Sequence, residues 1–225
     1  MVGFLVPPLR LKIGKKEVMQ SSAIDEAKLA LDYHQDGSAN GHHGVHQDLR
    51  MFGMVTFLIA ESAIFLGLFT AYLIFRSTSQ VWPPEGTPER ELLLPGINSI
   101  ILIASSFVMH QGQSAIRKND VSGLKLWFGL TALMGIIFLV GQGYEYFHLE
   151  FGLKTNLFAS FFYVLTGFHG LHVTLGLLLI LAVLWRSRKS GHYSSQSHFG
   201  VEAAELYWHF VDVVWVILFI LVYLL

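Results

Sequence analysis

The dominant pattern in this chain is a series of long apolar runs separated by short polar stretches. The runs cover residues 51–75, 95–116, 124–148, 156–185 and 201–225. At about 1.5 Å per residue, each is long enough for a helix to cross a hydrocarbon core of about 30 Å. The strands of a membrane barrel are only about 10 residues long. We therefore predict an all-α integral membrane protein, a bundle of five transmembrane helices.

The composition agrees with this prediction. Hydrophobic residues make up 53% of the chain and charged residues 14%, with a mean hydropathy of +0.51, whereas a soluble domain carries roughly 25% charged residues. The net charge of −1 gives no indication of nucleic-acid binding. Cysteine is absent, which excludes thiolate copper centres, cysteine-ligated iron–sulfur clusters and disulfides.

Residues 1–50 differ from the rest of the chain because they mix Lys, Asp, Gln, Gly and Pro. We expect a polar, water-facing N-terminal arm attached to a membrane domain of residues 51–225. The arm lacks the apolar core and cleavage site of a secretory signal, so the first span is expected to direct insertion. His42, His43 and His46 could bind a metal, but no carboxylate or cysteine completes a tetrahedral set at defined spacing.

The distribution of Lys and Arg predicts the orientation. With five crossings, the arm and the second and fourth loops share one side of the membrane. They hold 12 of the 15 basic residues, and only Arg76, Arg90 and Lys154 lie on the other side. Cytoplasmic loops carry the excess of Lys and Arg, so we predict a cytoplasmic N-terminus and a C-terminus outside.

Two spans carry polar residues along one face. In the second span these residues fall within about 140° of arc at 100° per residue: Asn98, Ser99, Ser105, Ser106, His110 and Gln113. In the last span an arc of roughly 120° holds Glu205, Trp208, His209, Asp212 and Trp215. We predict that both faces pack on protein, and that Trp208, His209 and Asp212 hold the last helix against its neighbours or a lipid headgroup near its cytoplasmic end.

The first span contains one acid, Glu61, near its middle. An ionised carboxyl at the bilayer centre costs on the order of 3 kcal/mol, and the sequence shows no basic partner for it. We therefore expect Glu61 to be protonated, or held by water or a headgroup. Glu145, Glu202 and Glu205 lie nearer the ends of their spans, where we expect more solvent.

Histidines within the spans leave a second interpretation open. His169 and His172 share one face of the fourth span, and His110 and His209 lie on other helices, so haem ligation by these four residues is an alternative to helix packing. A di-iron site is disfavoured, because Glu145 and His148 form one Glu-x-x-His pair and such a site needs two.

Three strings carry a family resemblance: Thr166-Gly-Phe-His-Gly-Leu-His-Val173, Phe199-Gly-Val-Glu-Ala-Ala204 and Tyr207-Trp-His-Phe-Val-Asp-Val-Val-Trp215. They closely resemble subunit III of the haem–copper cytochrome c oxidases. The similarity extends over residues 50–225 and includes Trp82-Pro-Pro84, the stretch from Asn98 to Ser105, Glu145-Tyr146 and the acid Glu61. The chain is similar to the short five-helix form found in bacteria and cyanobacteria, which lacks the first two of the seven spans.

The resemblance implies a non-catalytic subunit of a proton-pumping, oxygen-reducing respiratory oxidase. Such a subunit binds neither haem nor copper, packs directly on subunit I in a complex that includes subunit II, and supports proton uptake and stability there. It also implies that Glu61 is the intramembrane acid associated with bound phospholipid and carbodiimide reactivity. From the polar residues themselves, and not from the resemblance, we expect helix packing by Asn98, Ser105, His110, Glu145, His169 and His172. The alternatives are subunit III of a quinol oxidase and, from another class, a haem- or quinone-binding membrane subunit. We expect the chain in a bacterial plasma membrane, with a thylakoid membrane left open.

Overall fold

The computed structural model describes residues 41–85, 87, 92–189 and 191–225, and side chains from residue 49 onward. These residues form five long helices followed by one π-helical turn: α2 (Gly41–Thr78), α3 (Leu93–Arg117), α4 (Val121–His148), α5 (Leu157–Arg186), α6 (Phe199–Phe219) and η1 (Ile220–Leu224). All five helices are long and apolar enough to cross a membrane, with η1 completing the fifth span, Phe199–Leu224. The predicted all-α membrane bundle is confirmed.

The helix bounds lie within three residues of the predicted ones for the last four spans. The first helix begins at Gly41, ten residues before the expected start at residue 51, although its membrane-spanning part begins only at Leu49. Hydropathy marks where lipid contact begins, whereas backbone hydrogen bonds continue a helix into water. His42, His43 and His46 therefore have helical backbone. Their side chains, and residues 1–40 of the expected arm, lie outside the described residues.

Side-chain caps determine where two of the helices begin. The Asp120 carboxylate accepts a hydrogen bond from the Gly123 amide at 2.8 Å, and the Asn156 side-chain oxygen accepts one from the Ala159 amide at 2.8 Å. These caps satisfy amide groups that have no partner within α4 and α5. Asp120 therefore starts α4 immediately after the short turn that follows α3.

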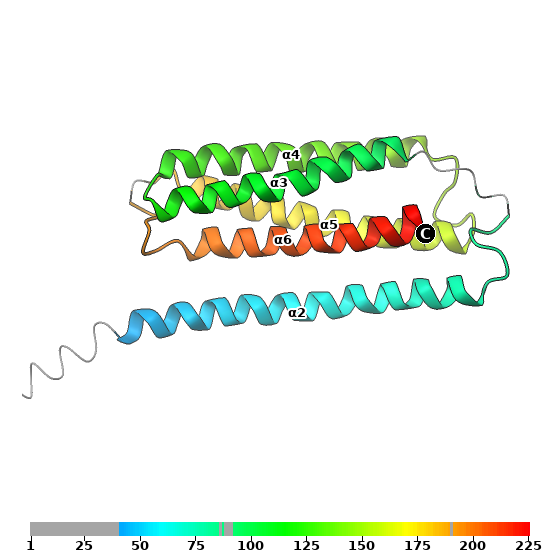
Figure 1. Ribbon diagram of the computed structural model, residues 1–225, viewed down its shortest axis with the longest axis horizontal. Helices are drawn as coiled ribbons and strands as arrows, with labels where there is room; N and C mark the ends of the chain where they lie inside the picture. The colour runs from blue at the N-terminus through cyan, green and yellow to red at the C-terminus, as the bar shows by residue number, and fades with distance from the viewer. Residues whose placement is uncertain (1–40, 86, 88–91, 190) are drawn as a thin grey trace, which may run out of the picture. The chain divides into compact units, whose positions relative to one another are not determined.

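Helices α3, α4, α5 and α6 form a four-helix bundle in which α3 and α5 each contact both α4 and α6 (Figure 1). The indole of Trp208, fully buried, fills the centre. It fits because Gly135 of α4 and Gly176 of α5 have no side chains. A Cβ at these positions would lie 2.7 Å and 2.9 Å from the indole ring. Small residues thus let the helices approach closely around one large side chain.

Helix α2 runs beside this bundle and contacts it on one face only. Leu58, Phe65 and Tyr72 recur every seven residues and are buried. The Phe65 ring packs 5.1 Å from that of Phe168 in α5 and 6.2 Å from that of Phe210 in α6. The opposite face carries exposed apolar side chains, including Ile59 and Leu66. Helix α2 therefore meets the bundle through aromatic side chains and presents its other face to lipid.

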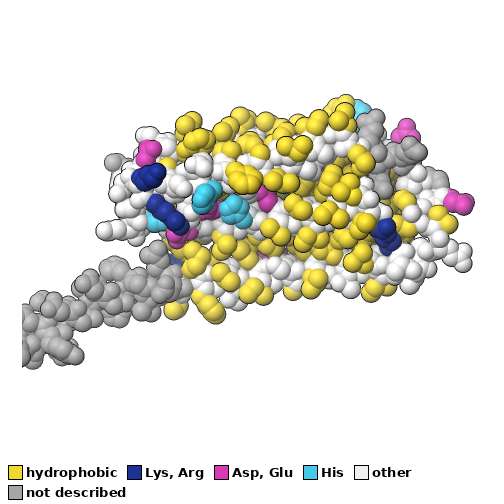
Figure 2. All heavy atoms as spheres, viewed as in Figure 1, with side chains coloured by type: hydrophobic (Ala, Val, Ile, Leu, Met, Phe, Trp, Pro, Cys, Tyr) yellow, Lys and Arg dark blue, Asp and Glu magenta, His cyan; other side chains and the backbone are white. Residues whose placement is uncertain are grey.

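The loop that joins α5 to α6 is fixed at the basic end of the bundle. The Asn119 side chain, at a residue with φ of 60°, accepts a hydrogen bond from the Ser195 amide at 2.7 Å. Tyr193 is buried against Gly200. This burial raises the pKa of the Tyr193 hydroxyl, although the nearby charge of Arg186 acts to lower it. Basic side chains of the described loops and helix ends gather here: Arg117, Lys118, Lys125, Arg186, Arg188 and Lys189. Figure 2 shows Lys and Arg at this end.

Candidate functional site

The acid of the first span has a partner in the structure. Glu61 Oε2 lies 3.2 Å from Nε2 of His172 in α5. The Glu61 side chain is 20% exposed and that of His172 5%. Glu61 lies near the middle of the span Leu49–Thr78, as predicted. The expectation that Glu61 has no basic partner was wrong, because His172 reaches it across the contact between α2 and α5.

The geometry of His172 fixes how the pair can share a proton. His172 Nδ1 lies 2.8 Å from the Phe168 carbonyl oxygen, which can only accept, so Nδ1 carries a proton. Nε2 then either accepts a proton from a neutral Glu61 carboxyl or donates one to the carboxylate. The pair has no net charge in either case. This neutrality is what allows an acid near the bilayer centre.

A third polar group lies near this pair. Tyr207 of α6 has a buried hydroxyl without a hydrogen-bond partner among the described residues, and the Glu61 carboxyl lies close enough to act on it electrostatically. The Tyr207 ring stacks on Phe57 of α2, with ring centroids 6.4 Å apart. Its ring also packs against Gly176 of α5, so the tyrosine joins α2, α5 and α6. Sequence reasoning missed it because a tyrosine in a span is usually an interfacial anchor.

The polar faces predicted on the second and last spans meet each other. Trp208 Nε1 donates to Ser105 Oγ at 2.8 Å, and Trp215 Nε1 donates to Ser99 Oγ at 2.9 Å. These contacts, together with those of His110 and Ser106 described below, join α3 and α6 along what we call the α3–α6 seam. Asn98 lies on the same helix but packs against Gly141 of α4.

An acid–histidine cluster occupies the seam nearer the basic end. Glu205 Oε1 lies 3.0 Å from His110 Nδ1 and 3.6 Å from His209 Nε2. The Glu205 side chain is only 7% exposed. The expectation that Glu205 is more solvated than Glu61 was wrong. Proximity to the helix end exposes a side chain only where no neighbour covers it, and α3 covers Glu205.

A chain of hydrogen bonds continues from this cluster towards the middle of the membrane. His209 Nδ1 lies 3.0 Å from Ser106 Oγ, which bonds in turn to Asp212 Oδ2. Because the carboxylate accepts, the Ser106 hydroxyl donates to Asp212 and its oxygen accepts from His209. Asp212 lies at the middle of α6 and η1, not near the cytoplasmic end as predicted. The Oδ1 atom of Asp212 and the Oε2 atom of Glu205 are buried without a partner among the described residues.

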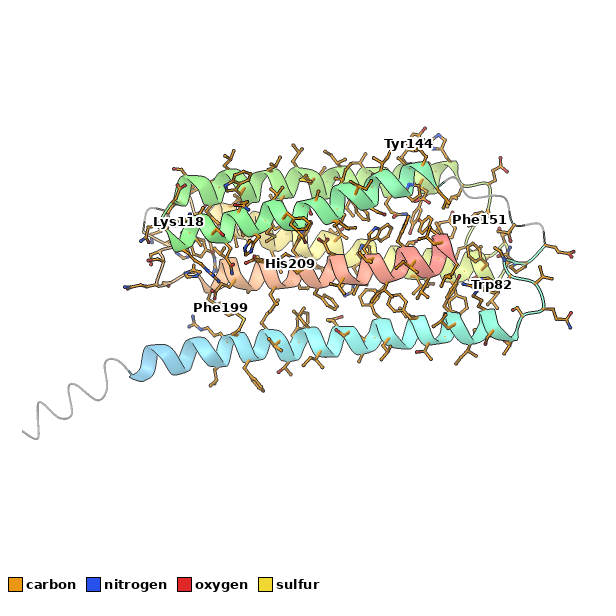
Figure 3. All side chains as sticks on the ribbon, in the orientation of Figure 1. Trp82, Lys118, Tyr144, Phe151, Phe199 and His209 are labelled. Atoms are coloured by element: carbon orange, nitrogen blue, oxygen red, sulfur yellow. The ribbon has the colours of Figure 1, made fainter. Side chains whose placement is uncertain are left out.

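The seam opens to the surface of the bundle as a groove of about 600 Å³. Ser106, Asp212, His110 and His209 line it together with apolar side chains of α3 and α6. The His110 side chain is 57% exposed and that of His209 42%. Figure 3 shows His209 between the two helices, and Figure 2 shows histidine and acidic groups beside hydrophobic ones on this face.

Glu145 also has a partner that the sequence did not reveal. The Tyr223 hydroxyl of η1 lies 3.0 Å from Glu145 Oε1 and 3.1 Å from Glu145 Oε2. Gln142 Nε2 donates a hydrogen bond to Glu145 Oε2 at 3.0 Å. Tyr223 is buried at 3% exposure. Glu145 therefore ties α4 to the end of α6, at the far end of the bundle from His209.

The structure does not gather the four histidines considered as haem ligands. His110 and His209 meet at Glu205, whereas His172 faces Glu61 on the other side of α6. His169 is fully buried, with its ring 4.9 Å from that of Trp215 and 5.9 Å from that of Phe138. Among the described residues, no group of three or more His, Asp or Glu side chains is arranged to hold a metal ion.

Comparison with known proteins identifies the family to which the chain is similar. The family model described as "Cytochrome c oxidase subunit III" matches residues 17–225. The chain is 80% identical over 189 residues to cytochrome c oxidase subunit 3 of Synechocystis sp., covering 84% of this chain and 81% of that one. It is 59% identical to the Thermostichus vulcanus protein of the same name, covering 82% and 91%. It is 35% identical to that of Rattus norvegicus, covering 85% and 76%.

Proposed function

Because the chain belongs to the cytochrome c oxidase subunit III family, we propose that it is a non-catalytic subunit that packs directly on the catalytic subunit I, in a complex that includes subunit II. The observation that carries this proposal is the family match over residues 17–225, which includes all five membrane spans. Electron transfer and oxygen reduction then take place in the partner subunits. This chain supports proton uptake and stability there.

The experiment that tests this proposal is purification of the complex from native membranes through a tag on this chain. Mass spectrometry of the gently solubilised complex should identify a haem–copper subunit I and a subunit II in equal amounts with this chain. Recovery of the chain without a haem–copper subunit would refute the proposal. An identical purification from cells that carry no tag controls for adventitious binding.

We also propose that this chain binds no haem or quinone. The support is the surroundings of its membrane histidines, since His110 and His209 face Glu205 and His172 faces Glu61. His169 is enclosed by the rings of Phe138 and Trp215, which leave no space for a haem beside it. A pyridine haemochrome spectrum of the isolated chain should show no haem, and extraction should recover no quinone. A stoichiometric haem signal would favour the alternative of a cytochrome-like subunit.

The basic residues support an orientation with the N-terminus in the cytoplasm. Gln196 is exposed in the loop between α5 and α6, and Glu85 is exposed at the opposite end of the bundle. In sealed right-side-out vesicles, an impermeant thiol reagent should label Glu85→Cys and leave Gln196→Cys unlabelled until lysis. The opposite pattern would invert the topology.

Glu61 and His172 are proposed as the polar site of the subunit within the membrane, in contact with structural phospholipid. The support is their position, since the side chain of Glu61 is partly exposed beside the lipid-facing surface of α2. The neutral pair holds a proton without a net charge and so is compatible with lipid on that side. Trp208, His209 and Asp212 have a different proposed role, because they hold α6 against α3.

A further inference from the structure

The groove on the α3–α6 seam has apolar walls and one acidic residue, Asp212, in its lining. Its walls are apolar and come from Ile103 and Phe107 of α3 and from Val213 and Val216 of α6. Asp212, at 7% exposure, lies among them with Ser106. Phe107, at 72% exposure, stands at the edge. An apolar ligand would fit the walls but leave the polar groups unmatched.

Asp212 has an unmet hydrogen-bonding need at this place. Only Oδ2 bonds within the chain, to Ser106, and Oδ1 is buried without a partner among the described residues. A buried acceptor left unsatisfied is unfavourable, more so for a charged group. In a membrane no bulk water relieves it. The ligand that completes this site therefore brings a hydrogen-bond donor.

The depth of Asp212 decides which kind of molecule can bring that donor. The residue lies near the midpoint of the 26-residue span Phe199–Leu224, roughly 20 Å from its first residue. Lipid headgroups stay at the interface, and the phosphate that most of them carry would repel a carboxylate. A side chain on another membrane-spanning helix reaches this level with a donor, and its apolar neighbours match the walls of the groove.

We propose that the groove is the docking site for a transmembrane helix of the catalytic subunit, which inserts a hydrogen-bond-donating side chain toward Asp212. The apolar walls receive the aliphatic and aromatic neighbours of that donor, and the imidazoles of His110 and His209 flank it. This inference rests on the proposed function for the identity of the partner. The groove, the unsatisfied carboxyl oxygen and the depth are independent of it.

Photocrosslinking in the intact complex tests the docking site directly. p-Benzoylphenylalanine replaces Phe107, and the complex is purified through a tag on this chain and irradiated. We expect an adduct with a membrane-spanning peptide of subunit I that contains Arg, Lys, Trp, Asn or Gln. The matched control is Leu171, which is 53% exposed at the middle of α5, the helix diagonally opposite α3. The same substitution there should give no adduct with that peptide.

Four other crosslinking results would contradict the proposed docking site. They are an adduct with lipid alone, no adduct, equal adducts from positions 107 and 171, and an adduct with a loop outside the membrane. Absence of any haem–copper subunit from the purified material would refute the proposed function instead, so the two failures are distinguishable.

Subunit retention gives a second test that depends on the carboxyl group. Asp212→Leu should lower the amount of this chain that stays bound to the complex in detergent by about tenfold or more. The substitution removes the carboxylate that accepts the partner helix's hydrogen bond, and a hydrogen bond to a charged group contributes more than one between neutral groups. The control is Ser99→Ala, which removes the acceptor of Trp215 in the same seam but outside the groove. Equal retention of the two variants, with the isolated chains equally stable, would overturn the proposal.

Discussion

The α3–α6 seam and the contact of α2 with the bundle each contain a pairing of a glutamate with histidine, yet they are built differently. In the four-helix bundle that contains the seam, Gly135 of α4 and Gly176 of α5 make room for the Trp208 indole, and the indoles of Trp208 and Trp215 donate to serines of α3. Helix α2 meets the bundle through large rings such as Phe65. Between the described side chains of α2 and the four-helix bundle proper, Glu61–His172 is the one ion-pair contact.

The difference shows how a membrane protein distributes its specificity. Lipid tails are as apolar as leucine, so apolar burial alone does not choose between helix neighbours. Close packing around small residues and directed hydrogen bonds do, and the four-helix bundle has both. Helix α2 has broad aromatic contact, the Glu61–His172 pair, and a hydrogen bond from the Tyr72 hydroxyl to the Leu221 carbonyl of η1 at 3.0 Å. We therefore expect substitutions inside the four-helix bundle to destabilise the protein more than substitutions where α2 contacts it.

The largest expected effect is overpacking at the centre of the bundle. Gly176→Val adds a side chain where Trp208 leaves no room, and we expect destabilisation of about 3 kcal/mol. Gly67→Val is the matched change on α2, where a Cβ meets nothing within 4 Å, and should cost under about 1 kcal/mol. The free energy of unfolding in detergent, measured by steric trapping, compares them. Similar losses would contradict the distinction between the two regions.

A smaller effect is expected from the seam's hydrogen bonds. Ser105→Ala leaves the Trp208 indole N–H buried without its acceptor, which should cost about 1–2 kcal/mol. Ser62→Ala on α2 is the control, because its hydroxyl bonds only to the Leu58 carbonyl of its own helix at 2.7 Å. Thermal denaturation of both variants measures the difference. A loss of stability in Ser62→Ala as large as that in Ser105→Ala would show that the hydrogen bonds of the seam do not contribute more than those within α2.

The polar pair of α2 should tolerate a conservative change. In Glu61→Gln the amide N–H can donate to His172 Nε2, so we expect intact assembly, nearly unchanged electron transfer and a stability change below about 0.5 kcal/mol. Glu61→Leu leaves His172 Nε2 unpaired and should cost about 1 kcal/mol. Oxygen consumption and subunit stoichiometry are the measurements. Complete loss of turnover in the glutamine variant would make the acid obligatory.

The smallest perturbation is chemical labelling, which compares the acids of the two regions. Dicyclohexylcarbodiimide partitions into lipid, and Glu61 is partly exposed there, whereas Glu205 is enclosed between α3 and α6. We therefore expect adducts on Glu61 in preference to Glu145, Glu202 and Glu205, as judged by peptide mapping. Preferential labelling of Glu205 would show that the seam opens to lipid more readily than α2 does.

The amino-acid sequence alone predicts the five helices and the polar faces of α3 and α6. Both properties are local, since hydropathy over some twenty residues fixes a span and the 3.6-residue period fixes a face. The face that carries Glu205, Trp208 and Asp212 does lie against α3. The resemblance in Thr166–Val173 and Tyr207–Trp215 also identified the family, which the comparisons show.

Which of these groups meet depends on how the helices pack in three dimensions. The partner of Glu61 is His172, more than a hundred residues away along the chain, and the partner of Glu145 is Tyr223 in a turn that reads as apolar. Glu205 is buried because α3 covers it, not because of its place in α6. Periodicity shows that a helix has a polar face but does not specify its neighbour, since that choice depends on shape complementarity among all the helices at once.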